Sequence, residues 1–103
     1  MDKIASLKDF LKDSPENNFL QHALALEYVK IGNESEARML FETILKRDAG
    51  YIGSYYHLAK LLERVGDTKE AVNVYERGMV SAKEAGDNHA YNELRGAYED
   101  LIF

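Results

Sequence analysis

Apolar residues recur along this chain at spacings of three and four, and strict alternation of apolar and polar residues never extends beyond a few positions. That period is typical of amphipathic helices and not of half-buried strands. The pattern predicts helices over residues of about 2–13, 18–31, 35–47, 53–65, 68–85 and 88–101. The predicted fold class is therefore all-α.

Glycine, proline and short polar side chains mark the ends of these segments. The glycines that follow apolar-periodic segments are Gly32, Gly50, Gly66 and Gly86. A helix C-terminus favours glycine because the capping residue takes a positive φ. Pro15 ends the first helix, since the residue before a proline is disfavoured in the α region. Asp67 and Asp87 supply N-cap oxygens for the fifth and sixth helices.

The chain aligns with itself when it is shifted by 34 residues. The matching pairs are Leu24-Ala25 with Leu58-Ala59, Gly32-Asn33 with Gly66-Asp67, Glu36-Ala37 with Glu70-Ala71, and Phe41-Glu42 with Tyr75-Glu76. This pattern indicates a duplicated helix-turn-helix unit, in which each pair leaves an apolar side for a stacked neighbour. Close helix approach requires small residues, and Ala25 opposite Ala37 and Ala59 opposite Ala71 meet that need. Leucine at Ala37 or Ala71 is expected to destabilise the protein by overpacking.

These spacings resemble the tetratricopeptide repeat family. The first unit reads Gln21-x2-Leu24-Ala25-x2-Tyr28 and then Ala37-x3-Phe41, and the second reads Tyr55-x2-Leu58-Ala59-x2-Leu62 and then Ala71-x3-Tyr75. The departures from the family pattern are Gln21 for an aromatic residue, Leu62 for tyrosine, and Ala49 and Lys83 for the closing proline. The resemblance implies a right-handed superhelical stack of antiparallel helix pairs with about six helices.

The whole chain, residues 1–103, is predicted to form one domain of this kind. Residues 1–17 form an N-terminal half-repeat helix, 18–51 the first repeat, 52–85 the second repeat, and 86–103 a C-terminal capping helix. Lys3 and Arg95 stand where the inner repeats have their close-contact alanines, so both are expected to be exposed. Gly78 is expected to allow close approach of the sixth helix, and deletion of residues 88–103 is expected to expose one side of the fifth.

Composition narrows the function classes. The 13 basic and 18 acidic residues give a net charge of -5, which disfavours nucleic acids and anionic membranes as partners. The chain has no cysteine, so disulfides, thiolate metal sites and cysteine nucleophiles are excluded. No catalytic motif, convergent titratable set, signal peptide or membrane-spanning apolar run is visible. We therefore expect a cytoplasmic protein that is not an enzyme and has no cofactor and no metal.

The resemblance implies that the first helix of each pair lines a concave groove. The predicted partner-binding residues are Phe19, His22, Leu26, Val29, Lys30, Tyr56, Lys60, Glu63 and Arg64. Several of the apolar members exceed what their helices need for burial, and an exposed apolar row marks a contact surface. The alternative is that the first helix or the curvature of the stack covers them. Changing Leu26 to Asp and Tyr56 to Ala is expected to abolish partner capture while the fold stays stable.

The charged and imidazole groups give further expectations for this groove. Lys30, Lys60 and Arg64 flank the apolar row, so the ligand is expected to pair apolar anchors with acidic residues. Chaperone-binding family members hold a peptide carboxylate with a clamp of Lys, Asn and Arg. The matching positions here are His22, Leu26, His57, His89 and Glu93, which do not support that activity. The three histidines either bind an anion when protonated or are ordinary helix histidines.

Two function classes follow. The leading hypothesis is an adaptor or scaffold that binds a peptide or helix of a partner protein in the groove. The alternative is a homo-oligomer, a homodimer for example, assembled through the same apolar surface. The apolar segment Leu101-Ile102-Phe103 either folds back as a cap or contacts another chain.

Overall fold

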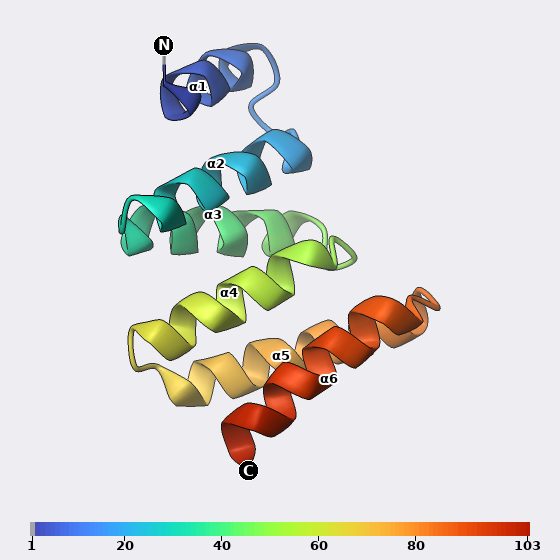
Figure 1. Cartoon of the computed structure of the whole chain (residues 1–103). Helices are drawn as coiled ribbons and strands as arrows, with labels where there is room; N and C mark the ends of the chain where they lie inside the picture. Colours follow the sequence, from blue (N-terminus) through green and yellow to red (C-terminus); the bar gives the residue numbers. More distant parts are fainter. Residues whose placement is uncertain (1) are drawn as a thin grey trace.

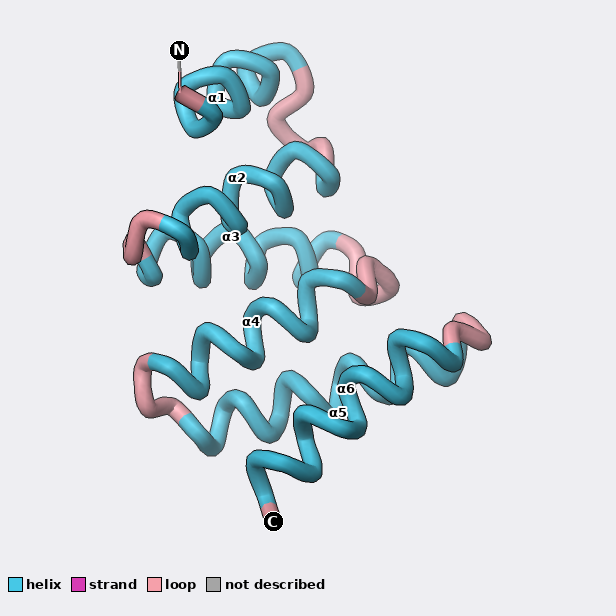
Figure 2. Tube along the Cα trace, viewed as in Figure 1, coloured by secondary structure: helices cyan, strands magenta, loops and turns pink. Residues whose placement is uncertain are grey.

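The computed structural model describes residues 2–103 as helices joined by short turns, with no strand among those residues (Figures 1 and 2). The helices are α1 (Lys3–Asp13), α2 (Asn18–Lys30), α3 (Glu34–Arg47), α4 (Gly53–Arg64), α5 (Thr68–Glu84) and α6 (Asn88–Ile102). Each helix packs against the next in chain order, and the chain descends from α1 to α6 (Figure 1). The predicted all-α stack of helix pairs is confirmed, and each predicted helix end lies within one residue of the observed end.

Three of the four predicted capping glycines take the left-handed conformation. The φ angles of Gly32, Gly66 and Gly86 are 78°, 85° and 70°, so an L side chain at these turns would be strained. The prediction for Gly50 is wrong, because Gly50 has no positive φ. The connection after α3 is instead closed by a side chain, since the backbone N–H of Gly50 donates to Asp48 Oδ1 at 3.0 Å.

The predicted N-caps are confirmed. Asp67 Oδ1 accepts the backbone N–H of Glu70 at 3.3 Å, and Asp87 Oδ1 accepts that of Ala90 at 3.0 Å. Asn33 caps α3 in the same way at the position equivalent to Asp67. An N-cap side chain satisfies a backbone donor that has no partner within the helix, so these short polar residues fix where the paired helices begin.

The helices approach one another where the sequence places alanine. Ala25, Ala37, Ala59 and Ala71 have no exposed surface. They lie in one continuous apolar core with larger side chains from the same helices, including Leu24, Phe41, Leu58 and Tyr75. Lys3 and Arg95, which replace alanine in the terminal helices, are both exposed as predicted.

A hydrogen bond repeated 34 residues apart explains why Gln21 replaces an aromatic residue. Gln21 Nε2 donates to the carbonyl of Pro15 at 2.8 Å, and Tyr55 Oη donates to the carbonyl of Ala49 at 2.6 Å. Both side chains are buried. Arg47 Nη2 donates to Gln21 Oε1 at 2.7 Å, which satisfies the other end of the amide. Glutamine therefore holds the preceding connection in place as tyrosine does in the second repeat.

Gly78 of α5 lies where three helices meet. A Cβ atom added there would lie 2.7 Å from Tyr55 Cβ on α4 and 3.1 Å from Leu94 Cδ1 on α6. The predicted close approach of the sixth helix is present, and α4 approaches still more closely. Glycine at this position therefore lets α5 pack against both neighbours at once.

Candidate functional site

The predicted binding residues lie on the first helices of the repeats. Figure 1 shows α2, α4 and α6 on the near side of the stack, with α3 and α5 behind them. We define the α2–α4–α6 face by the following residues: Phe19, His22, Leu26, Val29 and Lys30 of α2; Tyr56, His57, Lys60, Glu63 and Arg64 of α4; and Glu93 and Asp100 of α6.

An aromatic and imidazole cluster joins α2 to α4 on this face. The ring centroids of His22 and His57 are 5.4 Å apart in an edge-on arrangement. His22 also packs its ring edge-on against Phe41 of α3 at 5.5 Å, and Tyr56 meets His57 at 5.6 Å with the rings perpendicular. His22 Nδ1 lies 2.9 Å from the Oγ of the buried Ser54. The two histidines therefore connect the first helices of adjacent repeats.

The surroundings of this pair keep both rings neutral at neutral pH. Burial, together with the nearby His57, lowers the pKa of His22 from 6.5 to about 4. Burial also lowers the pKa of His57, although the Glu93 carboxylate acts in the opposite direction. The arrangement favours helix histidines with packed, satisfied rings over an anion site at neutral pH. His89 is exposed on α6 and has no aromatic contact of this kind within residues 2–103.

Lowering the pH is expected to destabilise the fold through His22. The unfolded chain protonates this imidazole near pH 6.5, whereas the folded protein resists protonation until about pH 4. The contribution of neutral His22 is therefore complete above pH 6.5 and is lost as the pH falls through that window. Because the ring keeps some access to water, we expect a loss of about 1–2 kcal/mol in the free energy of unfolding, measured by urea denaturation across this range.

His22→Gln is the test variant for this effect, since an amide can still meet Ser54 but does not titrate. His89→Gln is the matched control, because His89 is exposed. The acid-dependent loss should shrink in His22→Gln and persist in His89→Gln. Equal pH profiles for the parent and His22→Gln would show that the His22 site does not resist protonation.

The apolar residues of the α2–α4–α6 face differ in how freely they are presented. Leu26, Val29 and Tyr56 are half-buried and pack against the core. These side chains therefore support the fold and keep some accessible surface, and their use as a contact surface stays a prediction. Phe19 is 71% exposed. The Leu26→Asp and Tyr56→Ala change is now expected to cost stability, whereas Phe19 can be altered without disturbing the core.

The three predicted cations are already compensated within the chain. Lys30 Nζ lies 3.0 Å from Glu27 Oε2, Lys60 Nζ lies 3.7 Å from Glu63 Oε2, and Arg64 Nε lies 3.5 Å from Glu34 Oε2. The expectation of an acidic ligand assumed that these charges were free. Each of them now has a carboxylate neighbour, so the physical basis of that expectation is much reduced.

A buried tyrosine fixes the position of the Glu63 carboxylate. The hydroxyl of Tyr75, a residue with no exposed surface, donates a hydrogen bond to Glu63 Oε2. Burial and this hydrogen bond raise the pKa of the Tyr75 hydroxyl, so the hydroxyl keeps its proton and remains a donor. The carboxylate of Glu63 is thereby held at the α4 surface, where its side chain stays partly exposed.

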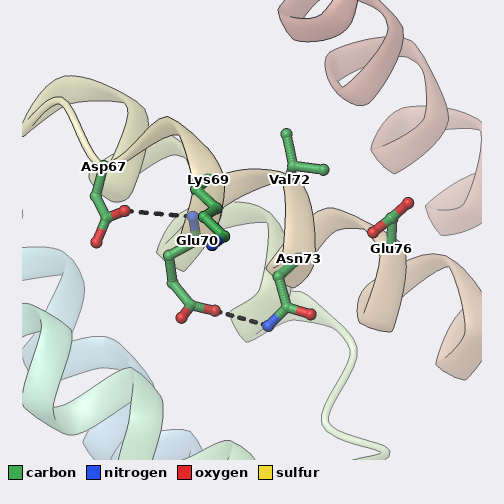
Figure 3. Close-up of a pocket in the computed structure, with 6 residues that line it drawn as sticks. All are labelled: Asp67, Lys69, Glu70, Val72, Asn73 and Glu76. Atoms are coloured by element: carbon green, nitrogen blue, oxygen red, sulfur yellow. Dashed lines mark hydrogen bonds between the residues drawn. The ribbon is translucent and has the colours of Figure 1, made fainter.

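A surface hollow lies elsewhere, on α5. It has a volume of about 650 Å³ and is lined by Asp67, Lys69, Glu70, Val72, Asn73 and Glu76 (Figure 3). All three of its aspartate and glutamate side chains have internal partners: Asp67 caps α5, Glu70 Oε1 accepts Asn73 Nδ2 at 2.7 Å, and Glu76 Oε2 accepts the hydroxyl of Tyr98 at 3.3 Å. Val72 is the single apolar residue in the lining. The sequence did not single out this hollow, and its carboxylates are already hydrogen-bonded within the chain.

Within residues 2–103, no three His, Cys, Asp or Glu side chains gather in a way that would hold a metal ion. No helix in this part of the chain is long and apolar enough to cross a membrane.

The sequence is similar to tetratricopeptide repeat proteins in two comparisons. The family model described as tetratricopeptide repeat matches residues 52–79. A tetratricopeptide repeat-containing protein of Pseudomonas aeruginosa is 25% identical over 91 residues, which cover 88% of this chain and 87% of that protein.

Solved structures of tetratricopeptide repeat domains have the same fold as this chain. The solution structure of a tetratricopeptide repeat domain protein from Salinibacter ruber is 40% identical, with a TM-score of 0.82 over 85% of this chain and 89% of that one. The TPR2B domain of yeast Sti1, solved as a complex with pHsp70, has a TM-score of 0.87 over 95% of this chain and 78% of that one. That second pair is 15% identical, so it supports the fold alone.

Proposed function

This chain belongs to the tetratricopeptide repeat family, and from that membership we propose that it is a protein-interaction module. The binding surface in this proposal is the α2–α4–α6 face, and the ligand is a segment of a partner protein. The observation that carries the proposal is that Phe19 is largely exposed, and that Leu26, Val29 and Tyr56 are only half-buried, on helices whose other faces pack in the core. Accessible apolar groups on a rigid frame lose little entropy on binding, which favours a docking surface.

The fold shared with the yeast Sti1 domain is compatible with this proposal, because that domain was solved as a complex with pHsp70. The comparison supports binding as a use of this helical frame, and the ligand of the present chain is a separate question. The residues of the α2–α4–α6 face differ in type from the carboxylate clamp, with His22 and Leu26 among the matching positions.

Phe19→Asp is expected to weaken partner capture at least tenfold, as the loss of an aromatic anchor at an interface does. Stability should change by less than about 0.5 kcal/mol, because Phe19 is largely exposed. Met39→Asp is the matched control, since Met39 is also an exposed apolar residue but lies on α3. The measurement is pulldown of partners from the native cell with the parent and both variants, followed by urea denaturation of each.

Photo-crosslinking locates the contact directly. A photoreactive residue at Phe19 should crosslink a partner that the same residue at Met39 does not. Crosslinks from Met39 alone would place the binding surface on α3 and contradict the proposal. A sedimentation mass of twice the chain mass, with crosslinks from Phe19 to a second copy, would support the homo-oligomer instead.

A further inference from the structure

Two histidines meet across the boundary between the two repeats. His22 belongs to α2 and His57 belongs to α4, and the centroids of their rings are 5.4 Å apart. Phe41 of α3 lies against both rings, edge-on to His22 at 5.5 Å and stacked on His57 at 6.2 Å between centroids. The two imidazoles therefore share one aromatic site, which is built from three helices.

The helices that carry this pair contact each other over a small area. α2 packs mainly on α1 and α3, and α4 packs mainly on α3 and α5, whereas the direct contact between α2 and α4 is slight. Figure 1 shows α3 behind the junction of α2 and α4. α3 therefore holds the two helices together from behind, and their near sides can separate while each keeps its contacts with α3.

The groups around the pair compensate positive charge unequally at the two rings. The titratable groups near it are Tyr51 from the connection before α4; Tyr56, Lys60 and Glu63 of α4; and Glu93 of α6. Glu93 acts on His57 and raises its pKa against the effect of burial. Within residues 2–103, no carboxylate acts on His22 in this way, and its Nδ1 lies 2.9 Å from the neutral hydroxyl of Ser54. A proton on His57 is thus partly compensated, and a proton on His22 is not.

The two rings therefore take up their protons in sequence as the pH falls. Burial lowers the pKa of both, and Glu93 offsets part of this effect at His57, so His57 is protonated first. The charged His57 then adds to the effect of burial and lowers the pKa of His22 to about 4. Near that pH two like charges lie 5.4 Å apart among aromatic rings, where water screens their repulsion less than at an exposed surface.

We propose that the His22–His57 pair is an acid-sensitive switch that separates α2 from α4 while both helices stay folded. The geometry carries this inference, because the two imidazoles lie on different repeats, face each other directly and share one aromatic site. Repulsion between two charged imidazoles is relieved when their helices move apart. Leu26 of α2 and Tyr56 of α4 move with their helices, so the α2–α4–α6 face changes shape in acid. The inference goes beyond the proposed function, and its test needs no partner.

Spin labels on α2 and α4 measure the separation directly. The chain has no cysteine, so Lys30→Cys with Arg64→Cys places one label on each helix at exposed, equivalent positions of the two repeats. Double electron–electron resonance should give a mean distance at pH 4 that is longer than at pH 7 by about 2 Å or more, the scale of helix shifts at interfaces. The far-ultraviolet circular dichroism should stay unchanged over this range, because the helices remain folded.

Glutamine variants assign the movement to the histidine pair. In the labelled protein, His22→Gln and His57→Gln each remove one of the two charges, so either change should abolish the acid shift. His89→Gln is the matched control, since His89 is exposed on α6, and it should keep the shift. In the unlabelled protein, His57→Gln should also raise the proton affinity of His22 by about threefold or more, measured by NMR titration of the ring resonances.

Three results would overturn the switch. The first is an unchanged label distance at a pH where NMR shows both rings protonated. The second is a distance change that coincides with loss of circular dichroism, because the whole chain then unfolds. The third is an acid shift that persists in His22→Gln and in His57→Gln, which would assign the movement to the carboxylates. The Phe19→Asp experiment is unaffected by any of these results, so the proposed function is tested separately.

Discussion

Leu94→Asp is expected to detach α6 from the stack and to lower the free energy of unfolding by about 3–5 kcal/mol. Within the described residues of α6, only Leu94 is fully buried, with 1% of its surface exposed. Its side chain reaches the backbone of α5 at Gly78. An aspartate there would bury a carboxylate without a partner, and the helix would separate rather than accept that cost.

This loss is a large part of the total stability of a chain of this size, since small domains are stable by only about 5–15 kcal/mol. The detached helix would leave one side of α5 uncovered. We therefore expect Leu94→Asp to bind a hydrophobic dye and to lose near-ultraviolet circular dichroism while it keeps most of its helical signal. The measurements are urea denaturation and these two spectroscopic signals.

Asn92→Asp is the control for Leu94→Asp. It adds the same charge to the same helix at an exposed position, so stability should change by less than about 0.5 kcal/mol. A Leu94→Asp protein with the parent's urea midpoint would mean that α6 contributes no buried contact to the fold. If both variants lost the same free energy of unfolding, the added charge on α6 would be the cause, and not the loss of the buried Leu94 contact.

The helices could be predicted closely because local chemistry determines where they begin and end. Gly32 and Gly66 were recognisable as turns since a positive φ is a property of one residue and its neighbours. The error at Gly50 has the same origin. A glycine that follows a helix does not always take a positive φ. At Gly50 the side chain of Asp48 closes the connection by accepting the backbone N–H.

The candidate site was less predictable, because its properties depend on pairing between helices. The sequence placed Lys60 and Arg64 in the fourth helix, as the structure does, but it could not show that Glu63 and Glu34 lie beside their charges. Glu34 belongs to the preceding repeat, so its approach to Arg64 depends on how the repeats stack.

Buried polar side chains were less predictable than the helix ends and more predictable than the candidate site. Gln21 was visible as a departure from the aromatic residue of the repeat pattern, but its reason was not. The structure shows an amide that meets the carbonyl of Pro15 and the guanidinium of Arg47 at once. The first repeat has Gln21 and Arg47 at the positions where the second repeat has Tyr55 and Ser81. This paired difference was the available signal in the sequence.

Gly78→Ala and Gly96→Ala are expected to change stability in opposite directions. Both glycines lie inside helices, where alanine is intrinsically more favourable by about 1 kcal/mol. At Gly96 of α6 an added Cβ meets no atom within 4 Å. Gly96→Ala should therefore raise the free energy of unfolding by about 0.5–1 kcal/mol, visible as a higher urea midpoint with an unchanged slope.

At Gly78 the same methyl group meets the packed interior. The added Cβ would lie 2.7 Å from Tyr55 Cβ and 3.0 Å from Tyr55 Cγ, and these atoms lie close to the α4 backbone and cannot rotate away. The helices must therefore separate, which is an overpacking cost of about 1–3 kcal/mol that exceeds the gain in helix propensity. Gly78→Ala should lower the urea midpoint. If it raised the midpoint as Gly96→Ala does, α5 would have room at this position, and the close three-helix contact through Tyr55 and Leu94 would be wrong.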